Sequence, residues 1–129
     1  MKKLLFLTIP LMISISACGP SSSPAARAYL NFHKAFCDTG KISSAKAFVS
    51  KDSQLYLGMA DTMMEALTSN NQTLQKGMEQ DCQNPPKVVG EIEVNSSRHI
   101  LQVVDFSGQS NEIVMILEDG DWKVKVNGN

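Results

Sequence analysis

The period of the hydrophobic residues changes once along this chain, at Asn84-Pro85-Pro86. Before these prolines, apolar residues recur every three or four positions, as in amphipathic helices; after them, they recur every second position, as in half-buried strands. Two consecutive prolines end a helix because proline lacks an amide hydrogen and its ring clashes with the preceding turn. The chain is therefore expected to form helices first and a sheet second, which is the α+β class.

Three helices are predicted before the prolines. The first begins after Ser23, an N-cap residue, with Pro24 at its first position, and it ends at Cys37, ahead of Gly40. A short second helix is predicted over residues 42–49. The third covers residues 59–80, and its apolar stripe consists of Met59, Met63, Leu67, Leu74 and Met78. Core packing is the favoured interpretation of its methionines, Met64 included, with an adaptable binding surface as the alternative.

Four strands are predicted after the prolines, over residues 87–95, 98–106, 111–118 and 122–126. The connections between them are short, which favours an antiparallel meander. The last connection, Asp119-Gly120, is typical of a type I′ hairpin. On the first strand, simple alternation places four residues on one face: Val88, Gly90, Ile92 and Val94.

The N-terminus has the features of an export signal. Lys2 and Lys3 precede an apolar run of about 13 residues, which is shorter than the about 20 residues that a membrane-spanning helix needs. Ile15-Ser16-Ala17-Cys18 resembles the lipobox of bacterial lipoproteins. The resemblance implies attachment of a diacylglyceryl group to Cys18, cleavage before it, and acylation of the new amine, typically with palmitate. An ordinary signal peptide is the alternative interpretation.

This interpretation divides the chain into residues 1–17, a cleaved signal peptide, residues 18–23, a short lipidated tether, and residues 24–129, a single α+β domain. The tether spans less than roughly 20 Å at about 3.5 Å per residue, so the domain is expected to sit close to its membrane. In lipoproteins of the enterobacterial type, an aspartate after the lipidated cysteine marks retention at the inner membrane. Gly19 therefore implies the outer membrane, with the domain facing the periplasm.

The charge of the mature chain argues against nucleic acid as a partner. Without Lys2 and Lys3, ten basic side chains remain against 13 acidic ones, a net charge of −3. A surface of this charge does not attract phosphate backbones or anionic head groups. The membrane is therefore expected to be a partner only through the lipid on Cys18.

Cys37 and Cys82 remain as a pair once Cys18 takes the lipid. In an oxidising compartment an even pair favours a disulfide, with a metal pair or two free thiols as alternatives. Closing a loop of this length stabilises the fold by about 4 kcal/mol in the chain-entropy model. With two histidines, His33 and His99, and no CxxC spacing, neither a metal site nor any cofactor is expected.

The order of these elements resembles the nuclear-transport-factor-2-like fold, also called the cone or cystatin-like fold, and small bacterial lipoproteins of that fold in particular. The residues that carry the resemblance are Ser23-Pro24, Tyr29-Leu30, Phe32, Ala35-Phe36, Gly40-Lys41-Ile42, Ala45, Ala47-Phe48 and Gly120-Asp121-Trp122-Lys123-Val124. It implies a cone-like domain, with two to three N-terminal helices packed on a four-stranded antiparallel meander. It does not decide function, because the fold hosts isomerases, dehydratases, ligand carriers and interaction modules.

Three side chains are candidates for lining a cleft between the helices and the sheet. Tyr29 and His33 are four residues apart and share one face of the first helix, and Trp122 follows the last hairpin. Enzymes of the cone fold place acid–base residues in this cleft, which makes Tyr29 and His33, with Asp105 on a strand, catalytic candidates. The alternative is that these side chains are core or rim residues that make one hydrogen bond each.

The sequence thus favours a non-enzymatic binding or interaction module, anchored in the cell envelope through Cys18. An envelope protein or a small apolar ligand is its expected partner. An isomerase- or dehydratase-like enzyme that uses Tyr29 and His33 is the alternative. The enzyme requires His33 to reach a carboxylate in an enclosed cone, whereas a cone filled by Phe36, Trp122 and methionines would exclude it.

Overall fold

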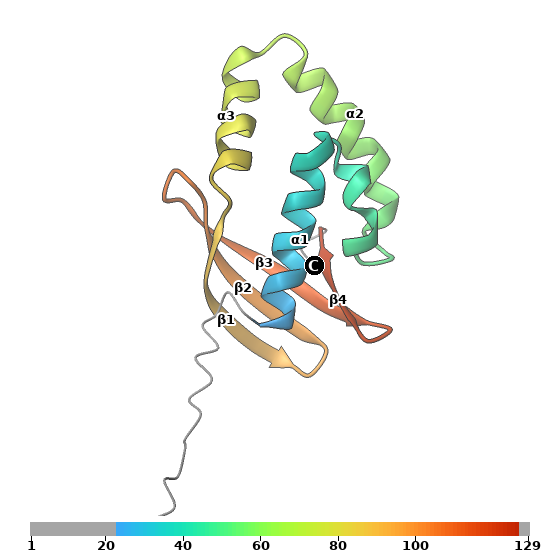
Figure 1. Ribbon diagram of the computed structural model, residues 1–129. Coiled ribbons are helices and arrows are strands. Elements are labelled where there is room, and N and C mark those ends of the chain that lie inside the picture. Colours follow the sequence, from blue (N-terminus) through green and yellow to red (C-terminus); the bar gives the residue numbers. More distant parts are fainter. Residues whose placement is uncertain (1–22, 127–129) are drawn as a thin grey trace, which may run out of the picture.

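A computed structural model describes residues 23–126; the predicted signal peptide, the lipidation residue Cys18 and most of the tether lie outside these residues. Helices precede a four-stranded antiparallel sheet, which confirms the α+β class and the helices-on-meander arrangement (Figure 1). The elements are α1 (Pro24–Thr39), the 3₁₀ helices η2 (Ile42–Phe48) and η3 (Gln54–Tyr56), α2 (Leu57–Thr68), α3 (Gln72–Gln83), β1 (Lys87–Asn95), β2 (Arg98–Val104), β3 (Ser110–Glu118) and β4 (Asp121–Lys125).

Helix α1 begins and ends at the residues that the sequence indicates. The Ser23 hydroxyl accepts a hydrogen bond from the Ala26 amide at 3.1 Å, which satisfies one of the free amides of the first turn. Gly40 ends the helix in the left-handed region at φ 71°, and its amide donates to the Phe36 carbonyl at 2.7 Å. The helix therefore extends two residues beyond Cys37, to Thr39.

The single helix predicted over residues 59–80 is wrong, because the chain forms α2 and α3 with a break between them. Asn71 is extended at φ −125° and ψ 93°, and its side chain accepts a hydrogen bond from the Leu74 amide at 3.1 Å. This asparagine caps a new helix, which costs less than holding two consecutive asparagines inside one helix. The two helices form a hairpin that extends beyond the sheet (Figure 1).

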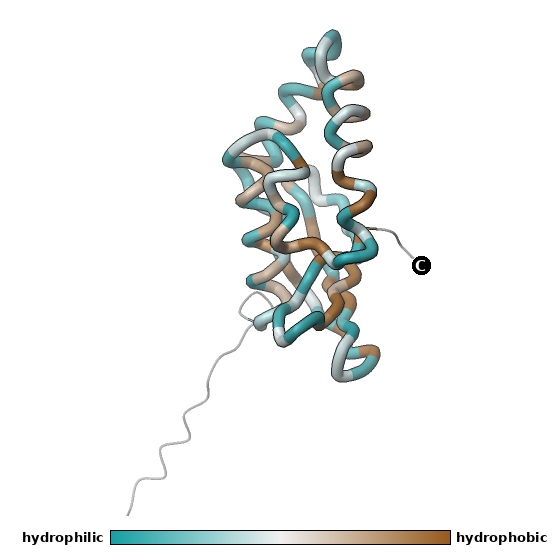
Figure 2. Tube along the Cα trace, turned by 90° about the vertical axis from the view of Figure 1, so that its right-hand side faces the viewer, coloured by the Kyte–Doolittle hydropathy of each residue, from teal (hydrophilic) through white to brown (hydrophobic). Residues whose placement is uncertain are grey.

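The favoured core position of the methionines in this segment is wrong for Met59 and Met63, whereas Met64 and Met78 are partly buried. Met59 and Met63 are 64% and 61% exposed, and Leu67 and Leu74 are exposed as well. The helix α2 packs against η2 and η3, and its buried residue is Leu57. Hydrophobic and hydrophilic residues are interspersed along the helices (Figure 2). The exposed hydrophobic side chains of α2 and α3 have no described neighbour to cover them.

The strands pair in the order β1-β2-β3-β4, and the Asp119-Gly120 turn has positive φ at both residues, as a type I′ turn requires. The simple alternation predicted for β1 fails at a bulge between Val88 and Gly90. Beyond this extra residue, Glu91 is opposite the fully buried Leu101. Ile92 and Val94 therefore turn outward, where they are about half exposed.

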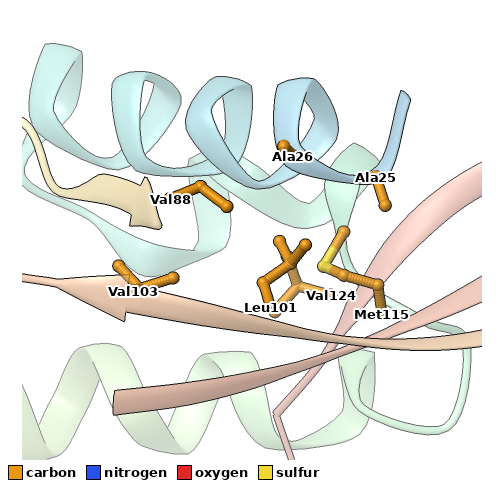
Figure 3. Packing of buried hydrophobic residues seen from close by; sticks show 7 residues of the cluster. All are labelled: Ala25, Ala26, Val88, Leu101, Val103, Met115 and Val124. Carbon is orange, nitrogen blue, oxygen red and sulfur yellow. The ribbon is translucent and has the colours of Figure 1, made fainter. Parts of the chain in front are cut away.

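The core lies between α1 and the inner face of the sheet. Two alanines of α1 let the helix approach the strands closely, and Leu101 of β2 and Met115 of β3 fill the centre with no exposed area. Figure 3 shows the alanines above the side chains of the sheet. The complete cluster is Ala25, Ala26, Val88, Leu101, Val103, Met115 and Val124.

The Cys37–Cys82 disulfide is present, as predicted, with 5.5 Å between the two Cα atoms. It joins the last turns of α1 and α3. Every side chain of α3 is at least partly exposed, so this bond is a principal attachment of the helix to the rest of the fold. Within residues 23–126, no helix is both long enough and apolar enough to cross a bilayer.

Candidate functional site

A groove of about 440 Å³ opens between α1, the end of α3 and the neighbouring ends of β2 and β3. We call it the α1 groove. Its polar side chains are Tyr29, His33, Asp81, Asp105, Asn111 and Glu112. Its apolar side chains are Pro86, Val103, Phe106 and Ile113. Tyr29 and His33, the two candidates predicted on one helical face, are thus brought together with three carboxyl groups beside an apolar floor.

His33 is held in place by its neighbours on two elements. Its Nε2 lies 3.1 Å from Oδ2 of Asp81, at the end of α3. Sγ of Cys37, one turn further along α1, lies beside the ring, 3.8 Å from Nδ1 and 3.9 Å from Nε2. The His33 side chain is only 11% exposed. The carboxylate that the enzyme alternative requires is therefore present, and it engages the Nε2 of a side chain that is largely covered by protein.

Tyr29 keeps its proton over an unusually wide pH range. Burial of the phenol, reinforced by the negative charges of Asp81 and Asp105, raises the pKa of Tyr29 to about 12. At neutral pH its hydroxyl is therefore a hydrogen-bond donor and acceptor, and it is not a base. Asp81 and Asp105 place negative charge near this end of the groove.

The pKa of Tyr29 predicts an alkaline loss of stability. Because the folded pKa lies above the ordinary value of 10, the contribution to stability is complete below pH 10 and is lost as pH rises from 10 towards 12. The chain has two tyrosines, so Tyr56→Phe leaves Tyr29 as the only phenol. Its absorbance at 295 nm should titrate with a midpoint near 12 in the folded chain and return to about 10 in urea. A folded midpoint near 10 would contradict the burial argument.

Asp105 is placed at the rim of the groove by the turn that follows β2. Its Oδ1 accepts hydrogen bonds from the Ser107 amide at 2.9 Å, the Ser107 hydroxyl at 2.6 Å and the Gln109 amide at 2.9 Å. The Ser107 hydroxyl is the main cause that holds the pKa of Asp105 below its ordinary range. Asp105 is thus a fixed negative charge that organises the turn, and one of its oxygens carries all three of these bonds.

Trp122, the third predicted cleft residue, lies at the other end of α1. It lines a separate hollow with Pro24 and Arg27, and its ring lies 4.3 Å from that of His99, centre to centre. His99 Nδ1 is 3.3 Å from Oε1 of Glu91, and the same oxygen accepts a hydrogen bond from the Ser23 hydroxyl at 3.1 Å. The β1 bulge brings Glu91 inward, so this acid ties the start of α1 to the sheet.

Asp81 is a groove residue that was not predicted from the sequence. An indirect indication was available: Cys37 is four residues after His33 on α1, and Asp81 immediately precedes Cys82. A Cys37–Cys82 bond therefore brings Asp81 next to His33. Within residues 23–126, no group of three or more histidine, cysteine, aspartate or glutamate side chains is arranged to hold a metal ion.

Comparison of the chain with protein-family models, with curated proteins and with solved structures finds no match in any of the three. The resemblances to lipoproteins and to the cone fold thus rest on the residues of this chain and on the order of its elements.

Proposed function

We propose that this chain is a lipid-anchored protein of the bacterial cell envelope that acts as a non-enzymatic binding module. The lipobox-like residues that end at Cys18 support the anchor, and Gly19 supports an outer-membrane position with the domain facing the periplasm. The Cys37–Cys82 disulfide adds support because it suits an oxidising compartment. It also leaves Cys18 as the cysteine available for the lipid.

The α1 groove is the observation that carries the binding role. Its apolar floor suits the hydrocarbon part of a ligand, whereas Asp105, Glu112 and the electronegative surroundings of Tyr29 suit a positive charge. The Tyr29 hydroxyl adds a hydrogen-bonding group between these regions. The ligand class that fits is therefore a small molecule, or the end of a partner chain, that combines an apolar part with an amine.

Two features of the same groove support the binding role over the enzyme alternative. A general base must present a ring nitrogen to the substrate, yet the His33 side chain is only 11% exposed and its Nε2 lies 3.1 Å from Asp81. Tyr29 cannot replace it, because a phenol with a pKa of about 12 retains its proton at neutral pH. The His33–Asp81 pair instead fixes the position of α3 against α1 and so shapes the groove.

Matched probes of opposite charge test the binding role. Hexylamine and hexanoate share an apolar part and differ in the sign of their head group. In the full chain, purified in a non-ionic detergent, hexylamine is expected to shift the amide resonances of Val103, Asp105 and Ile113, and hexanoate is not. Glu112→Gln should weaken hexylamine binding about three- to tenfold, because it removes a charge–charge interaction of about 1 kcal/mol.

Glu93→Gln provides the matched control for Glu112→Gln. Glu93 is also exposed, and it does not line the α1 groove. The control removes the same charge and should leave hexylamine binding unchanged. Equal shifts with hexanoate, or equal losses in the two variants, would show that net charge rather than the groove governs binding. No shift with either probe at millimolar concentration would refute the proposed ligand class.

A further inference from the structure

A row of large apolar side chains on η3 and along one side of α2 has no described neighbour that covers it. The row consists of Leu55, Tyr56, Met59, Met63 and Leu67, which are 83%, 49%, 64%, 61% and 57% exposed. From Tyr56 onward the residues are three or four apart, so they form one continuous ridge along the helix. Single exposed hydrophobic residues are ordinary, but a continuous ridge of this kind marks an interaction surface.

The two charged residues of α2 point away from this row. The Asp61 carboxylate accepts hydrogen bonds from the Ile42 amide at 2.6 Å and the Ser43 amide at 3.2 Å, both at the start of η2. Glu65 follows one helical turn later and therefore shares the side of Asp61. Within α2 the row is consequently free of charge, so two copies of α2 can face each other along it without opposing like charges.

The exposed area of the row is sufficient for a symmetric pair. Aromatic side chains bury about 150–250 Å² each, and with the lower half of that range for leucine and methionine the exposed parts of these five amount to roughly 500–600 Å² per copy. Pairing two rows would then bury at most about 1,200 Å² in total, which is the lower end of the range for specific complexes. Ridges with a spacing of four residues also interdigitate well between helices.

We propose that this row is a self-association surface, at which α2 packs against α2 of a second copy of the chain. Methionine suits such a contact because its flexible, polarizable side chain adapts to an identical surface. The contact is two-fold symmetric, so a residue in the middle of the row meets its own equivalent. Met63 is such a residue. The surface is separate from the α1 groove, and the inference does not depend on the ligand proposed for that groove.

Cysteine crosslinking tests this contact directly. Met63→Cys, made in the full chain and purified in a non-ionic detergent, is expected to form a covalent species of twice the chain mass on mild oxidation. Glu65→Cys is the matched control, because it lies two residues away on the same helix, is also exposed, and faces the other side. The dimer yield of Met63→Cys should be at least five times that of Glu65→Cys. Adding Met59→Glu to Met63→Cys should lower the yield at least fivefold.

Each other outcome overturns the inference. Equal yields from Met63→Cys and Glu65→Cys would indicate random collisions. An adduct whose mass is not twice that of the chain would assign the row to a different partner. A yield that Met59→Glu does not change would remove the row from the contact. Because all three substitutions are at exposed positions, unchanged thermal unfolding of each variant will show that the fold is intact.

Discussion

The Cys18→Ala variant, expressed in a bacterial host, is expected to lose all incorporation of radioactive palmitate. The thiol of Cys18 is the proposed attachment point of the diacylglyceryl group, and acylation of the amine follows cleavage at that same residue. One acyl chain holds a protein to a bilayer only weakly, because each buried CH₂ contributes about 0.8 kcal/mol; several chains on one residue make the attachment lasting. Removing one sulfur atom should therefore remove the whole anchor.

Two further variants make this experiment specific. The double variant Cys37→Ala with Cys82→Ala should keep the palmitate label, because it removes the other two cysteines and leaves Cys18 intact. Gly19→Asp should move the labelled protein from the outer to the inner membrane. Label on the Cys18→Ala variant would refute the lipid assignment, and wild-type protein recovered in the inner membrane would refute the sorting argument.

The fold could be predicted where local chemistry alone decides it. Ser23, Gly40 and the Asp119-Gly120 turn act within four residues of their own position, so their caps and turn were correctly predicted. The paired prolines at 85 and 86 separate the helices from the sheet for the same reason. The disulfide was also predictable, because an even number of cysteines remained after Cys18 was assigned.

The errors occur where two local preferences compete and the rest of the fold decides between them. The residues around Asn70 and Asn71 can continue a helix or cap a new one. In the fold, the Asn71 side chain accepts a hydrogen bond from the Leu74 amide and caps α3. A simple alternation of residues does not indicate the bulge after Val88. The one extra residue of the bulge reverses the face of every side chain that follows it. The alternation places Glu91 on the face opposite Val88, whereas the bulge puts Glu91 opposite the buried Leu101.

Only part of the α1 groove could be predicted from the sequence. Tyr29 and His33 are related by the helical repeat, and the helix alone places them together. Asp81, Asp105 and Glu112 come from three other elements, and their approach depends on the disulfide and on strand register. Trp122 follows a hairpin that the sequence predicted correctly, yet the distance along α1 separates it from the other two candidates.

Removing the disulfide is expected to give the largest loss of stability among the variants proposed for this chain. The bond joins residues 45 apart, and closing a loop of that length restricts the unfolded chain by about 4 kcal/mol in the chain-entropy model. Cys37→Ala with Cys82→Ala should therefore lower the free energy of unfolding by about 3–4 kcal/mol in urea titrations. This is a large part of the about 5–15 kcal/mol that stabilises a typical domain.

The loss of stability should also be larger in α3 than in the core. This distribution distinguishes a local role of the disulfide, which holds α3 in place, from a general effect on the whole fold. No residue of α3 is buried, so without the bond the His33–Asp81 contact is a main remaining attachment at that end. Amides of residues 72–83 should exchange with solvent much faster in the double variant, whereas those around Leu101 and Met115 should keep the protection of the folded core. Because His33 loses both the neighbouring sulfur and a fixed Asp81, hexylamine binding in the α1 groove should weaken in parallel. Uniform acceleration of exchange, or an unfolding free energy within 1 kcal/mol of the wild type, would show that contacts other than the disulfide hold α3 in place.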